Sequence, residues 1–480
     1  MNIPTVLPSK FIVKFQDDMF MGKSVSELLA NFWATAHYDD IPSTVVDKAK
    51  QLLLDHLGVA IAGAQSDFAR CALSGATLSS PSGSSVVLGR NERFPGPISA
   101  FLNGIASHVF ELDDFGGCGH SGAVVFPALF GVMPVKRLSG RHLLVSTIAG
   151  YDVAARVLEG SGGYYQNDSR GWHTTGTCGS FGAAAAASKA LGLDAEGFAA
   201  ALGIAGSFTG GIWAFLEDGS PTKSLHCGRA AENGLSAALL ACAGMDGPRF
   251  VLDAPWGGFF STYSCGSQQP HAALQNLGSD FRILATGLKT HACCRGLHVY
   301  VDALLSIIEH ENFELDQIET IIVHGTDYFR RKFDRPDIGS SSQAQFSIQY
   351  ALTATLLFGE VSFRDLFPAP RLNTSCEPIA KLIKISDRSA GAAFGQCPPV
   401  EVRLSDGRSL IGRVTNIRGA PDSPLAPEEL HQKFVALTSA VIGEHRSQQI
   451  ISFVSELESA DDMMELVELT RPLSPAPNTR

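Results

Sequence analysis

The sequence contains no C-x-x-C pair, although ten cysteines are distributed over its 480 residues. Most of these cysteines lie in stretches rich in alanine and glycine, as buried free thiols do. The missing spacing removes the usual sequence signal for an iron–sulfur cluster and gives no framework for disulfides. Lys10 and Lys14 are too few and too close to acidic residues to indicate a transit peptide. We therefore expect a cytoplasmic protein, with a mitochondrial location left open.

Several signatures of common enzyme and membrane-protein classes are also missing. No G-x-G-x-x-G follows a predicted strand, and no Walker lysine motif occurs, so nothing indicates a nucleotide. The G-x-S-x-G motif of α/β-hydrolases is absent as well. No apolar run is long enough for a transmembrane helix, and the first residues lack a convincing signal-peptide core. We expect neither a nucleotide cofactor nor a membrane partner.

The sequence has fewer basic than acidic residues. The chain has 37 Lys and Arg against 48 Asp and Glu, which gives a formal net charge of −11. Neither nucleic acid nor an anionic membrane attracts an acidic surface, so both are disfavoured as partners. An anionic small molecule remains possible, because a local basic pocket can oppose the overall sign. The content of 45% hydrophobic and 18% charged residues is typical of a compact, well-buried protein.

A change in residue composition and apolar periodicity divides the chain into a helical body and an inserted unit. Residues 25–63 carry apolar positions every three or four residues, and residues 96–275 are dominated by Ala, Gly and Leu. Near residue 277 the pattern changes: residues 318–327 alternate as a strand does, and Asp406-Gly407 is a hairpin turn. We predict a mainly α protein, with an all-helical domain over residues 24–276 and 424–475, an α+β lid domain over residues 277–423, and a loose leader over residues 1–23.

The most distinctive stretch is H-V-F-E-L-D-D-F-G-G-C-G-H-S-G-A-V-V-F-P, residues 108–127. It places Glu111, Asp113, Asp114, His120 and Ser121 on a glycine-rich loop between two apolar helices. Catalytic groups concentrate on loops that rigid elements hold in place. The alternative is a capped helix start, in which Asp114 or Ser121 binds backbone N–H groups.

Two further stretches combine histidine with groups that suit an anion. In G-W-H-T-T-G-T-C-G-S-F-G, residues 171–182, His173 and Thr174 precede a strongly helical alanine run, where donors favour a carboxylate. A threonine N-cap beside a satisfied histidine is the structural alternative. In S-P-T-K-S-L-H-C-G-R-A-A, Lys223 and His226 are three residues apart and share one face if this turn is helical. A lone lysine is usually solvated. Here, however, Lys223 borders a helix of small residues that we expect to be buried, and a buried ammonium needs an anion as its partner.

The last stretch with several candidate functional side chains is G-L-K-T-H-A-C-C-R-G-L-H, residues 287–298. It holds Lys289, His291, Arg295 and two adjacent cysteines within ten residues. Adjacent cysteines do not easily ligate one tetrahedral zinc ion together, and no second pair of ligands stands nearby, so we predict no metal site. Nothing indicates a lowered thiol pKa for a cysteine nucleophile. Clustered Lys and Arg suit a polycarboxylate better.

These stretches resemble the family of 2-methylcitrate dehydratase and cis-aconitate decarboxylase, MmgE/PrpD. The matching words are L-L-L-D-H-L-G, F-L-N-G-I-A-S-H-x-x-E-L-D-D, H-S-G-A-V-V-F-P, G-W-H-T-T-G-T-C-G-S-F-G-A-A-A-A-A-S-K-A-L-G-L, T-K-S-L-H-C-G-R-A-A-E-N-G and L-K-T-H-A-C-C-R-G-L-H. They occur in the family's order, and the resemblance covers roughly residues 25–470. It implies a large helical domain with a smaller lid, a homodimer, and chemistry without metal, cluster or nucleotide.

The resemblance also implies a site and a reaction. Its catalytic groups fall on Glu111, Asp113, Asp114, His120 and His173, and its substrate-binding groups on Lys223, Lys289, His226, Thr174 and Ser121. The expected activity is a cofactor-independent carbon–carbon lyase that decarboxylates cis-aconitate or a related tricarboxylate in the itaconate-forming manner. Dehydration of 2-methylcitrate or an alkylcitrate is the alternative, and a non-catalytic family member is a second. Phe115 departs from the Thr or Tyr that often follows the D-D pair in decarboxylases of this family, and the loop after it is about one residue short.

Overall fold

The computed structural model describes residues 22–366, 376–387 and 400–473, so the predicted leader lies almost wholly outside the described residues. Capping groups start the helical body where the sequence pattern predicts it. The hydroxyl of Ser24 accepts a hydrogen bond from the backbone nitrogen of Glu27, whose carboxylate accepts one from the backbone nitrogen of Ser24. The second long helix ends at Gly63, where a Cβ would overlap the carbonyl oxygen of Ala106.

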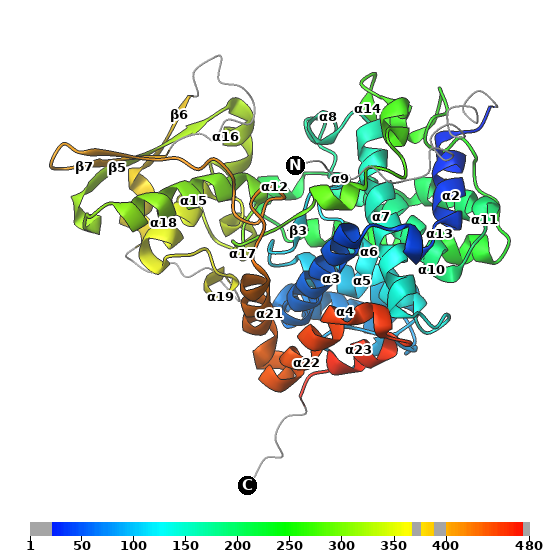
Figure 1. Ribbon diagram of the computed structural model, residues 1–480. Helices are drawn as coiled ribbons and strands as arrows, with labels where there is room; N and C mark the ends of the chain where they lie inside the picture. Colours follow the sequence, from blue (N-terminus) through cyan, green and yellow to red (C-terminus); the bar gives the residue numbers. More distant parts are fainter. Residues whose placement is uncertain (1–21, 367–375, 388–399, 474–480) are drawn as a thin grey trace, which may run out of the picture.

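A large body of helices forms the right-hand part of Figure 1. Its helices in chain order are α2 (Val25–Thr35), α3 (Ser43–Gly63), α4 (Asp67–Ser79), α5 (Gly96–His108), α6 (Gly122–Val132), α7 (Gly140–Gly160), α8 (Tyr164–Asp168), α9 (Thr174–Thr177), α10 (Gly179–Leu191), α11 (Ala195–Ala205), α12 (Phe215–Asp218), α13 (Lys223–Cys242) and α14 (Phe259–Ser264). Short 3₁₀ turns join them: η1 (Tyr38–Asp40), η2 (Gly206–Phe208), η3 (Pro270–Leu274) and η4 (Arg282–Ala285). Two small ribbons complete it, β1 (Ser85–Val86) with β2 (Arg93–Phe94) and β3 (Asp114–Phe115) with β4 (Gly287–Leu288).

Small residues let the central helices of this body approach closely. Helix α10 packs against both α7 and α13, and its alanines are fully buried. A Cβ on Gly182 of α10 would lie 2.8 Å from the carbonyl oxygen of Gly150 in α7. A Cβ on Gly234 of α13 would lie 2.5 Å from the backbone nitrogen of Ala184. The glycines are therefore needed at these crossings, because any side chain would push the helices apart.

A smaller group of elements, here called the β5–β8 unit, gathers around a second hydrophobic cluster. It contains α15 (Arg295–His310), η5 (Leu315–Gln317), β5 (Ile318–Gly325), α16 (Asp327–Phe333), α17 (Ser341–Ala344), α18 (Ile348–Phe358), α19 (Phe363–Leu366), α20 (Cys376–Leu382), β6 (Ile383–Asp387), β7 (Val400–Leu404) and β8 (Ser409–Gly412). The strand order is β6-β5-β7-β8; β5 pairs parallel with β6 and antiparallel with β7, and β7 pairs antiparallel with β8. Helix α15 packs on β7 and β8, and α18 packs on α15.

The chain then returns to the helical body. It forms α21 (Pro427–Ile442), α22 (Glu444–Ser455), η6 (Leu457–Ser459) and α23 (Met464–Leu469). Helix α21 packs along α3, as the lower part of Figure 1 shows. Among the described residues, no helix combines the length and the apolar character that crossing a membrane requires.

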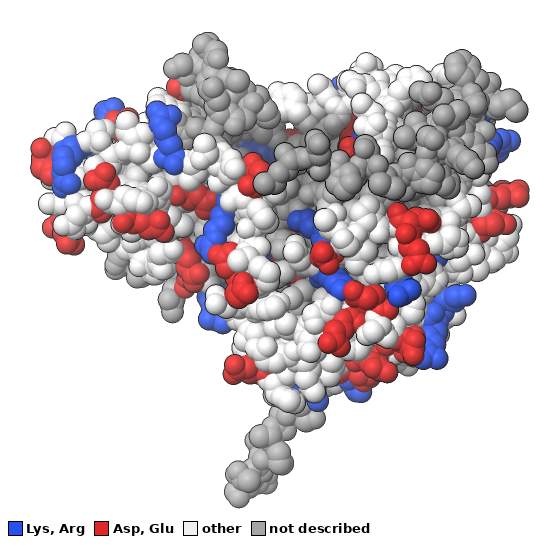
Figure 2. Space-filling view, viewed as in Figure 1, with Lys and Arg blue, Asp and Glu red and all other residues white. Residues whose placement is uncertain are grey.

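The mainly α class predicted from the sequence is confirmed, and so are the strand near residue 318 and the hairpin at Asp406-Gly407. The division into a helical domain and a lid domain over residues 277–423 stays a prediction. The second hydrophobic cluster gathers residues of the β5–β8 unit, but it also includes Val59, Val109, Phe215 and Leu437 from the body, while Ile283 of η4 and Leu288 of β4 belong to the first cluster. On the face shown in Figure 2, basic side chains are interspersed with acidic ones and form no broad basic surface among the described residues.

Candidate active site

A two-stranded ribbon joins the acidic loop to the predicted lysine stretch. Strand β3 pairs antiparallel with β4, with Asp114 opposite Leu288 and Phe115 opposite Gly287. Because Lys289 follows β4 directly, this pairing brings it to the beginning of the loop that carries the carboxylates. Glu111 turns into the loop with a φ of 51°, a left-handed conformation that non-glycine residues rarely adopt.

Helix α21, which follows the β5–β8 unit in the chain, contacts this junction. The ammonium of Lys433 donates hydrogen bonds to the backbone carbonyls of Leu112, at 2.8 Å, and Lys289, at 2.9 Å. It also forms an ion pair with the buried carboxylate of Asp55 in α3, at 2.5 Å. One side chain therefore ties together the loop after α5, the residue after β4 and helix α3.

Glycines give the acidic loop its tight turn towards α9. Gly116, Gly117 and Gly119 all have positive φ, between 55° and 126°, where a side chain would be strained. The hydroxyl of Thr174, the first residue of α9, donates to the carbonyl oxygen of Cys118 at 2.6 Å. Thr174, predicted to bind substrate, thus fixes the loop that carries His120 beside the start of α9.

Glu111 is the electrostatic centre of the buried cluster. Lys289 donates to its carboxylate at 2.7 Å and to its backbone carbonyl at 3.0 Å, and Lys223 binds its other carboxylate oxygen. His108 Nε2 lies 3.2 Å from the oxygen that Lys223 binds. Burial alone would raise the pKa of Glu111, but the two ammonium groups hold it well below its ordinary value. The predicted substrate-binding lysines therefore hold an internal carboxylate, although Lys223 also faces open space.

Asp113 connects two imidazoles. Its carboxylate oxygens lie 3.0 Å from His108 Nδ1, and one of them lies 3.2 Å from His120 Nδ1. His120 Nδ1 also lies 2.9 Å from the carbonyl oxygen of Asp114, so this nitrogen carries the proton and donates it. His120 Nε2 is then an acceptor, 3.4 Å from the ammonium of Lys223.

The two imidazoles on Asp113 titrate in opposite directions. Burial opposes the charge on His108, but the Asp113 carboxylate beside it raises the pKa of His108 above its ordinary value. Burial, together with the positive charges of His108 and Lys223, lowers the pKa of His120 to about 4 despite the attraction of Asp113. His120 is therefore neutral at pH 7, while the neighbouring Asp113 carboxylate favours the charged form of His108.

His173 supplies the second neutral imidazole. Its backbone nitrogen donates to the carbonyl oxygen of Gly211 at 3.0 Å, and its ring centroid lies 6.3 Å from that of His120. Its Nδ1 lies 3.0 Å from Nδ1 of His226, so one of these two nitrogens donates to the other. Burial and the Lys223 ammonium lower the pKa of His173 well below its ordinary value and that of His226 to about 4. His226 contacts His173 and supports its ring.

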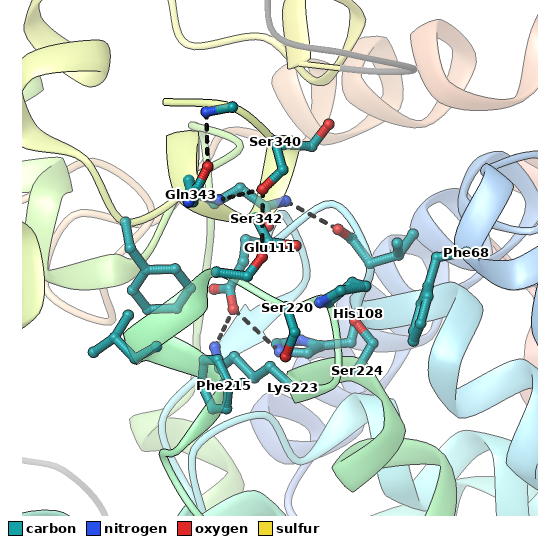
Figure 3. Close-up of a pocket in the computed structure, with 18 of the residues that line it drawn as sticks. Phe68, His108, Glu111, Phe215, Ser220, Lys223, Ser224, Ser340, Ser342 and Gln343 are labelled. Atoms are coloured by element: carbon teal, nitrogen blue, oxygen red, sulfur yellow. Dashed lines mark hydrogen bonds and ion pairs between the residues drawn. The ribbon is translucent and has the colours of Figure 1, made fainter. Parts of the chain in front are cut away.

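Two cavities meet at Lys223. The imidazole cavity, about 370 Å³, is lined by His120, His173, Lys223 and by residues of α15 and α16. The serine cavity, about 390 Å³, is lined by His108, Glu111, Lys223 and by several serines of the body and of α17. Figure 3 shows the serine cavity, with the Glu111 carboxylate between Lys223 and His108.

The charges on the two cavity walls differ. The residues that line the imidazole cavity include the cations Lys223, Arg295 and Lys332 and, within the described part of the chain, no carboxylate. The serine cavity includes the cations Lys223 and Arg335 but also the carboxylates of Asp67 and Glu111. An anion is therefore stabilised in the imidazole cavity, where its charge faces cations and two neutral imidazoles.

The remaining predicted residues support the loop. The Asp114 carboxylate accepts hydrogen bonds from the backbone nitrogen of Gly122, at 3.0 Å, and from the hydroxyl of Tyr151, at 2.7 Å. Burial and the neighbouring Asp113 raise the pKa of Asp114 to about 7. The hydroxyl of Ser121 accepts from the backbone nitrogen of Cys118 at 3.2 Å. For Asp114 the structure thus shows the capped helix start that the sequence left open, whereas Ser121 binds the backbone of the preceding loop and does not cap α6.

Several residues of the cavity were not among the predicted site residues. His108 stands in the motif that ends in E-L-D-D, so the sequence did contain a signal for it. Arg295 belongs to the cluster after Lys289, where it was noted only as one cation among several. Lys332 and Trp213 lie in no motif, and Lys332 reaches the cavity wall because α16 packs beside Trp213 of the body.

Three of the buried groups have the spacing of a metal site. One ligand atom each from His108, Asp113 and His120 lies within 4.8 Å of the others. However, Lys289 Nζ lies 3.9 Å from Asp113, and Lys223 Nζ lies 3.4 Å from His120. These ammonium groups would repel a divalent cation, so the charges around the three ligands do not fit one. That the protein uses no metal stays a prediction.

Known proteins are similar in sequence to almost the whole of this chain. The sequence models of the MmgE/PrpD N-terminal and C-terminal domains match residues 27–271 and 291–459. A cis-aconitate decarboxylase-like protein of Aspergillus oryzae is 30% identical, with 93% of this chain and 97% of that protein covered. The cis-aconitate decarboxylases of Mus musculus and Homo sapiens are each 28% identical, covering 94% and 95% of this chain and 94% and 96% of those proteins.

Proposed function

Because the chain belongs to the MmgE/PrpD family, we propose that it is a carbon–carbon lyase that decarboxylates cis-aconitate, or a closely related tricarboxylate, without a cofactor. The observation that carries the proposal is the imidazole cavity. It combines two neutral imidazoles, His120 and His173, with cations and with no carboxylate among its described lining residues. Such a wall suits a small polyanion whose carbon must receive a proton.

Substrate binding uses the charge that Lys223 directs into the cavity. Glu111 neutralises only part of the charge of Lys223 and Lys289, since one carboxylate faces two ammonium groups. A substrate carboxylate therefore gains a charge-assisted hydrogen bond to Lys223, worth about 1.5–3 kcal/mol. Lys289 is completely buried behind Glu111 and acts by holding that carboxylate in place.

In the chemical step, the bond between the departing carboxylate carbon and its neighbour breaks, and CO2 leaves. The electron pair stays on the substrate, where it spreads over the conjugated alkene and an adjacent carboxylate. The cations of the cavity stabilise this charge. One proton then adds to carbon, so cis-aconitate and a proton give itaconate and CO2.

The proton comes from an imidazole. The lowered pKa values make His120 and His173 neutral at pH 7. A bound trianion raises their pKa, because negative charge stabilises an imidazolium nearby. His120 has the better support for this step, since Asp113 accepts from its Nδ1 and leaves Nε2 directed towards Lys223.

Dehydration of 2-methylcitrate or an alkylcitrate is the second candidate, and the state of His120 favours it. A neutral imidazole whose Nδ1–H is held by Asp113 and the Asp114 carbonyl presents a lone pair at Nε2. That arrangement suits a base which removes a proton next to a carboxylate, while a second group protonates the departing hydroxyl. The two reactions differ in their products, because only decarboxylation releases CO2.

The test measures CO2 and alkene absorbance separately, with cis-aconitate and with 2-methylcitrate as substrates. We expect CO2 from cis-aconitate, and a turnover lowered about 10²–10⁴-fold in His120→Ala and in His173→Ala. His445→Ala, which alters an exposed histidine of α22, is the matched control. No CO2 from cis-aconitate, or near-normal turnover in both variants, contradicts the proposal. If no polycarboxylate shifts the melting temperature, a non-catalytic family member is the better account.

We further propose that the enzyme works as a homodimer. We place it in the cytoplasm, with a mitochondrial location as the alternative. We also propose that residues 277–423 act as a lid over the imidazole cavity. What supports the lid is the origin of the cavity wall: the helical body supplies His120, His173 and Lys223, while Arg295 and Lys332 come from the β5–β8 unit. Separation of the two groups of elements would expose both imidazoles to water.

A further inference from the structure

A buried ion pair crosses from the helical body to the β5–β8 unit beside the imidazole cavity. Asp168 is the last residue of α8 in the body, and its carboxylate lies 2.6 Å from the ammonium of Lys332 in α16. The hydroxyl of Tyr328, also in α16, donates to the second carboxylate oxygen of Asp168. Asp168 and Lys332 are only 5% and 6% exposed, so water screens their attraction little. One carboxylate of the body therefore holds two side chains of α16.

An indole ring of the body contacts the same ammonium. Lys332 Nζ lies 3.8 Å from the ring centroid of Trp213, a distance at which an aromatic face attracts a cation. The backbone nitrogen of Trp213 donates to the carbonyl oxygen of Gly171 at 3.0 Å, and its Nε1 donates to that of Trp172 at 3.1 Å. The ring is therefore fixed to the segment that follows α8. We call Asp168 and Trp213 together the Lys332 seat.

The ring of Trp213 also contacts one of the two neutral imidazoles. The ring centroids of Trp213 and His173 are 5.4 Å apart with an angle of 77° between the planes, the edge-to-face arrangement that aromatic pairs favour. Trp213, His173 and Lys332 all line the imidazole cavity. The placement of α16 and the placement of His173 are thus linked through a single side chain.

Two ion pairs of α16 differ in what they connect. Arg330 pairs at 2.7 Å with Asp387 of β6, whose side chain is 86% exposed, and this contact stays within the β5–β8 unit. The pair of Lys332 with Asp168 joins the unit to the body instead. Separation of the unit from the body would leave each buried charge without its partner until water hydrates it. The pair therefore favours the arrangement in which the cavity is closed.

We propose that the docking of Lys332 in its seat is the latch that holds the β5–β8 unit closed over the imidazole cavity. Asp168 and Trp213 are then positioning residues, which fix His173 in the closed arrangement. The inference rests on the proposed function and names the contact that controls closure of that site. When the latch separates, the Lys332 ammonium reaches water and the cavity opens, so that a substrate can enter and a product can leave.

The first test uses Cys294, which lines the cavity, as a reporter of opening. Its alkylation by iodoacetamide is followed by peptide mass spectrometry, with the exposed Cys242 as the reference. Asp168→Asn should raise the relative rate at Cys294 about tenfold or more, the value of a charge-assisted contact. Buried Cys178 reports unfolding and should stay unmodified. Asp387→Asn, which breaks the other pair of α16, is the matched control and should leave the rate unchanged.

Further variants ask whether the two charges act as one contact. Lys332→Met should raise the rate at Cys294 as Asp168→Asn does, whereas Lys332→Arg keeps the charge and should stay near wild type. The paired variant K332M/D168N leaves no buried charge unpaired and should open the cavity no further than either single variant. Tyr328→Phe removes only a hydroxyl and should raise the rate about twofold to tenfold.

The second test follows His173 itself. Diethyl pyrocarbonate modifies neutral imidazoles, and mass spectrometry gives the rate at His173 relative to the exposed His445. Trp213→Leu removes the ring and should raise this relative rate about twofold to tenfold. Trp213→Phe keeps an aromatic face and should stay near wild type. Asp168→Asn should raise the rate at His173 together with the rate at Cys294.

The inference is overturned if Asp168→Asn and K332M/D168N leave Cys294 at the wild-type rate, or if the effects of the two single variants add. It is also overturned if Cys178 becomes modified along with Cys294 in every variant, because the contact would then stabilise the whole body, or if Trp213→Leu leaves His173 unchanged. None of these measurements needs turnover. Protein that shows the latch but releases no CO2 from cis-aconitate would therefore keep the latch and reject only the decarboxylation.

Discussion

Replacing Glu111 with glutamine tests the electrostatic centre of the site. Glu111 is 2% exposed and is the carboxylate that both Lys223 and Lys289 contact. Glutamine keeps the size of the side chain but removes its charge, so two buried ammonium groups lose their shared counterion. Removing one partner of a buried ion pair typically costs about 3–5 kcal/mol. We therefore expect Glu111→Gln to lower the free energy of unfolding by about that amount.

Urea denaturation followed by tryptophan fluorescence measures the loss. The matched control is Glu468→Gln, because the Glu468 carboxylate also contacts two cations, Arg93 and Arg471. Its side chain is 45% exposed, and water screens such pairs, so the control should lie within about 1 kcal/mol of wild type. Similar losses in the two variants would refute the reasoning, because burial would then not decide the effect.

The pH dependence gives an independent check on the sign. The pKa of Glu111 is lowered in the folded protein, so its contribution to stability is present above the pKa of an unfolded glutamate, about 4.3. The contribution is lost as the pH falls through the lower folded value. The difference between wild type and Glu111→Gln should therefore stay constant from pH 5 to pH 8 and shrink only in more acidic solution. A difference that grows with acidity would contradict this account.

Two further predictions concern the supports of the acidic loop. Burial and Asp113 raise the pKa of Asp114 to about 7, so between about pH 4 and 7 the folded protein holds a proton that the unfolded chain has lost, and stability falls as pH rises. Asp114→Asn should flatten this slope in urea titrations at several pH values, and an unchanged slope would count against it. Lys433→Met should lower the free energy of unfolding by about 3–5 kcal/mol, because Asp55 stays buried without its partner. The double variant K433M/D55N should recover part of the loss, whereas a single variant within 1 kcal/mol of wild type would contradict the prediction.

The mainly α class and the loop of the candidate site could be proposed from the sequence because they depend on local patterns. Periodic apolar positions over residues 25–63 marked α3, which ends at Gly63 where that pattern ends. A functional role for the loop with Asp113 and His120 was predicted from the density of carboxylates and glycines, and it stays a prediction. Because these signals lie within a few residues of one another, no tertiary structure was needed to find them.

The pairing of charges could not be predicted in the same way. Lys223 and Lys289 were assigned to substrate carboxylates, but in the structure they meet Glu111, which is 112 and 178 residues away in the chain. That contact depends on the pairing of β3 with β4, two strands of two residues each. Elements this short give no periodic signal, and a tertiary contact decides their register.

The contact between Arg295 and Phe115 could not be predicted from the sequence either. Phe115 was noted as a departure that cannot donate a hydrogen bond, and Arg295 as one cation in a cluster. Only the folded chain brings the guanidinium over the ring. Lys332 had no sequence signal at all, since it lies at the end of a seven-residue helix rich in basic residues.

The contacts of Lys433 set an order for biosynthesis. A ribosome that has made the first 426 residues has already released every histidine and lysine that lines the imidazole cavity. Helix α21 does not yet exist at that moment, so the ammonium of Lys433 does not yet bind the carbonyls of Leu112 and Lys289. Nascent chains of that length should therefore remain open to proteases at the acidic loop, and resistance should arise only when the last tenth of the protein emerges.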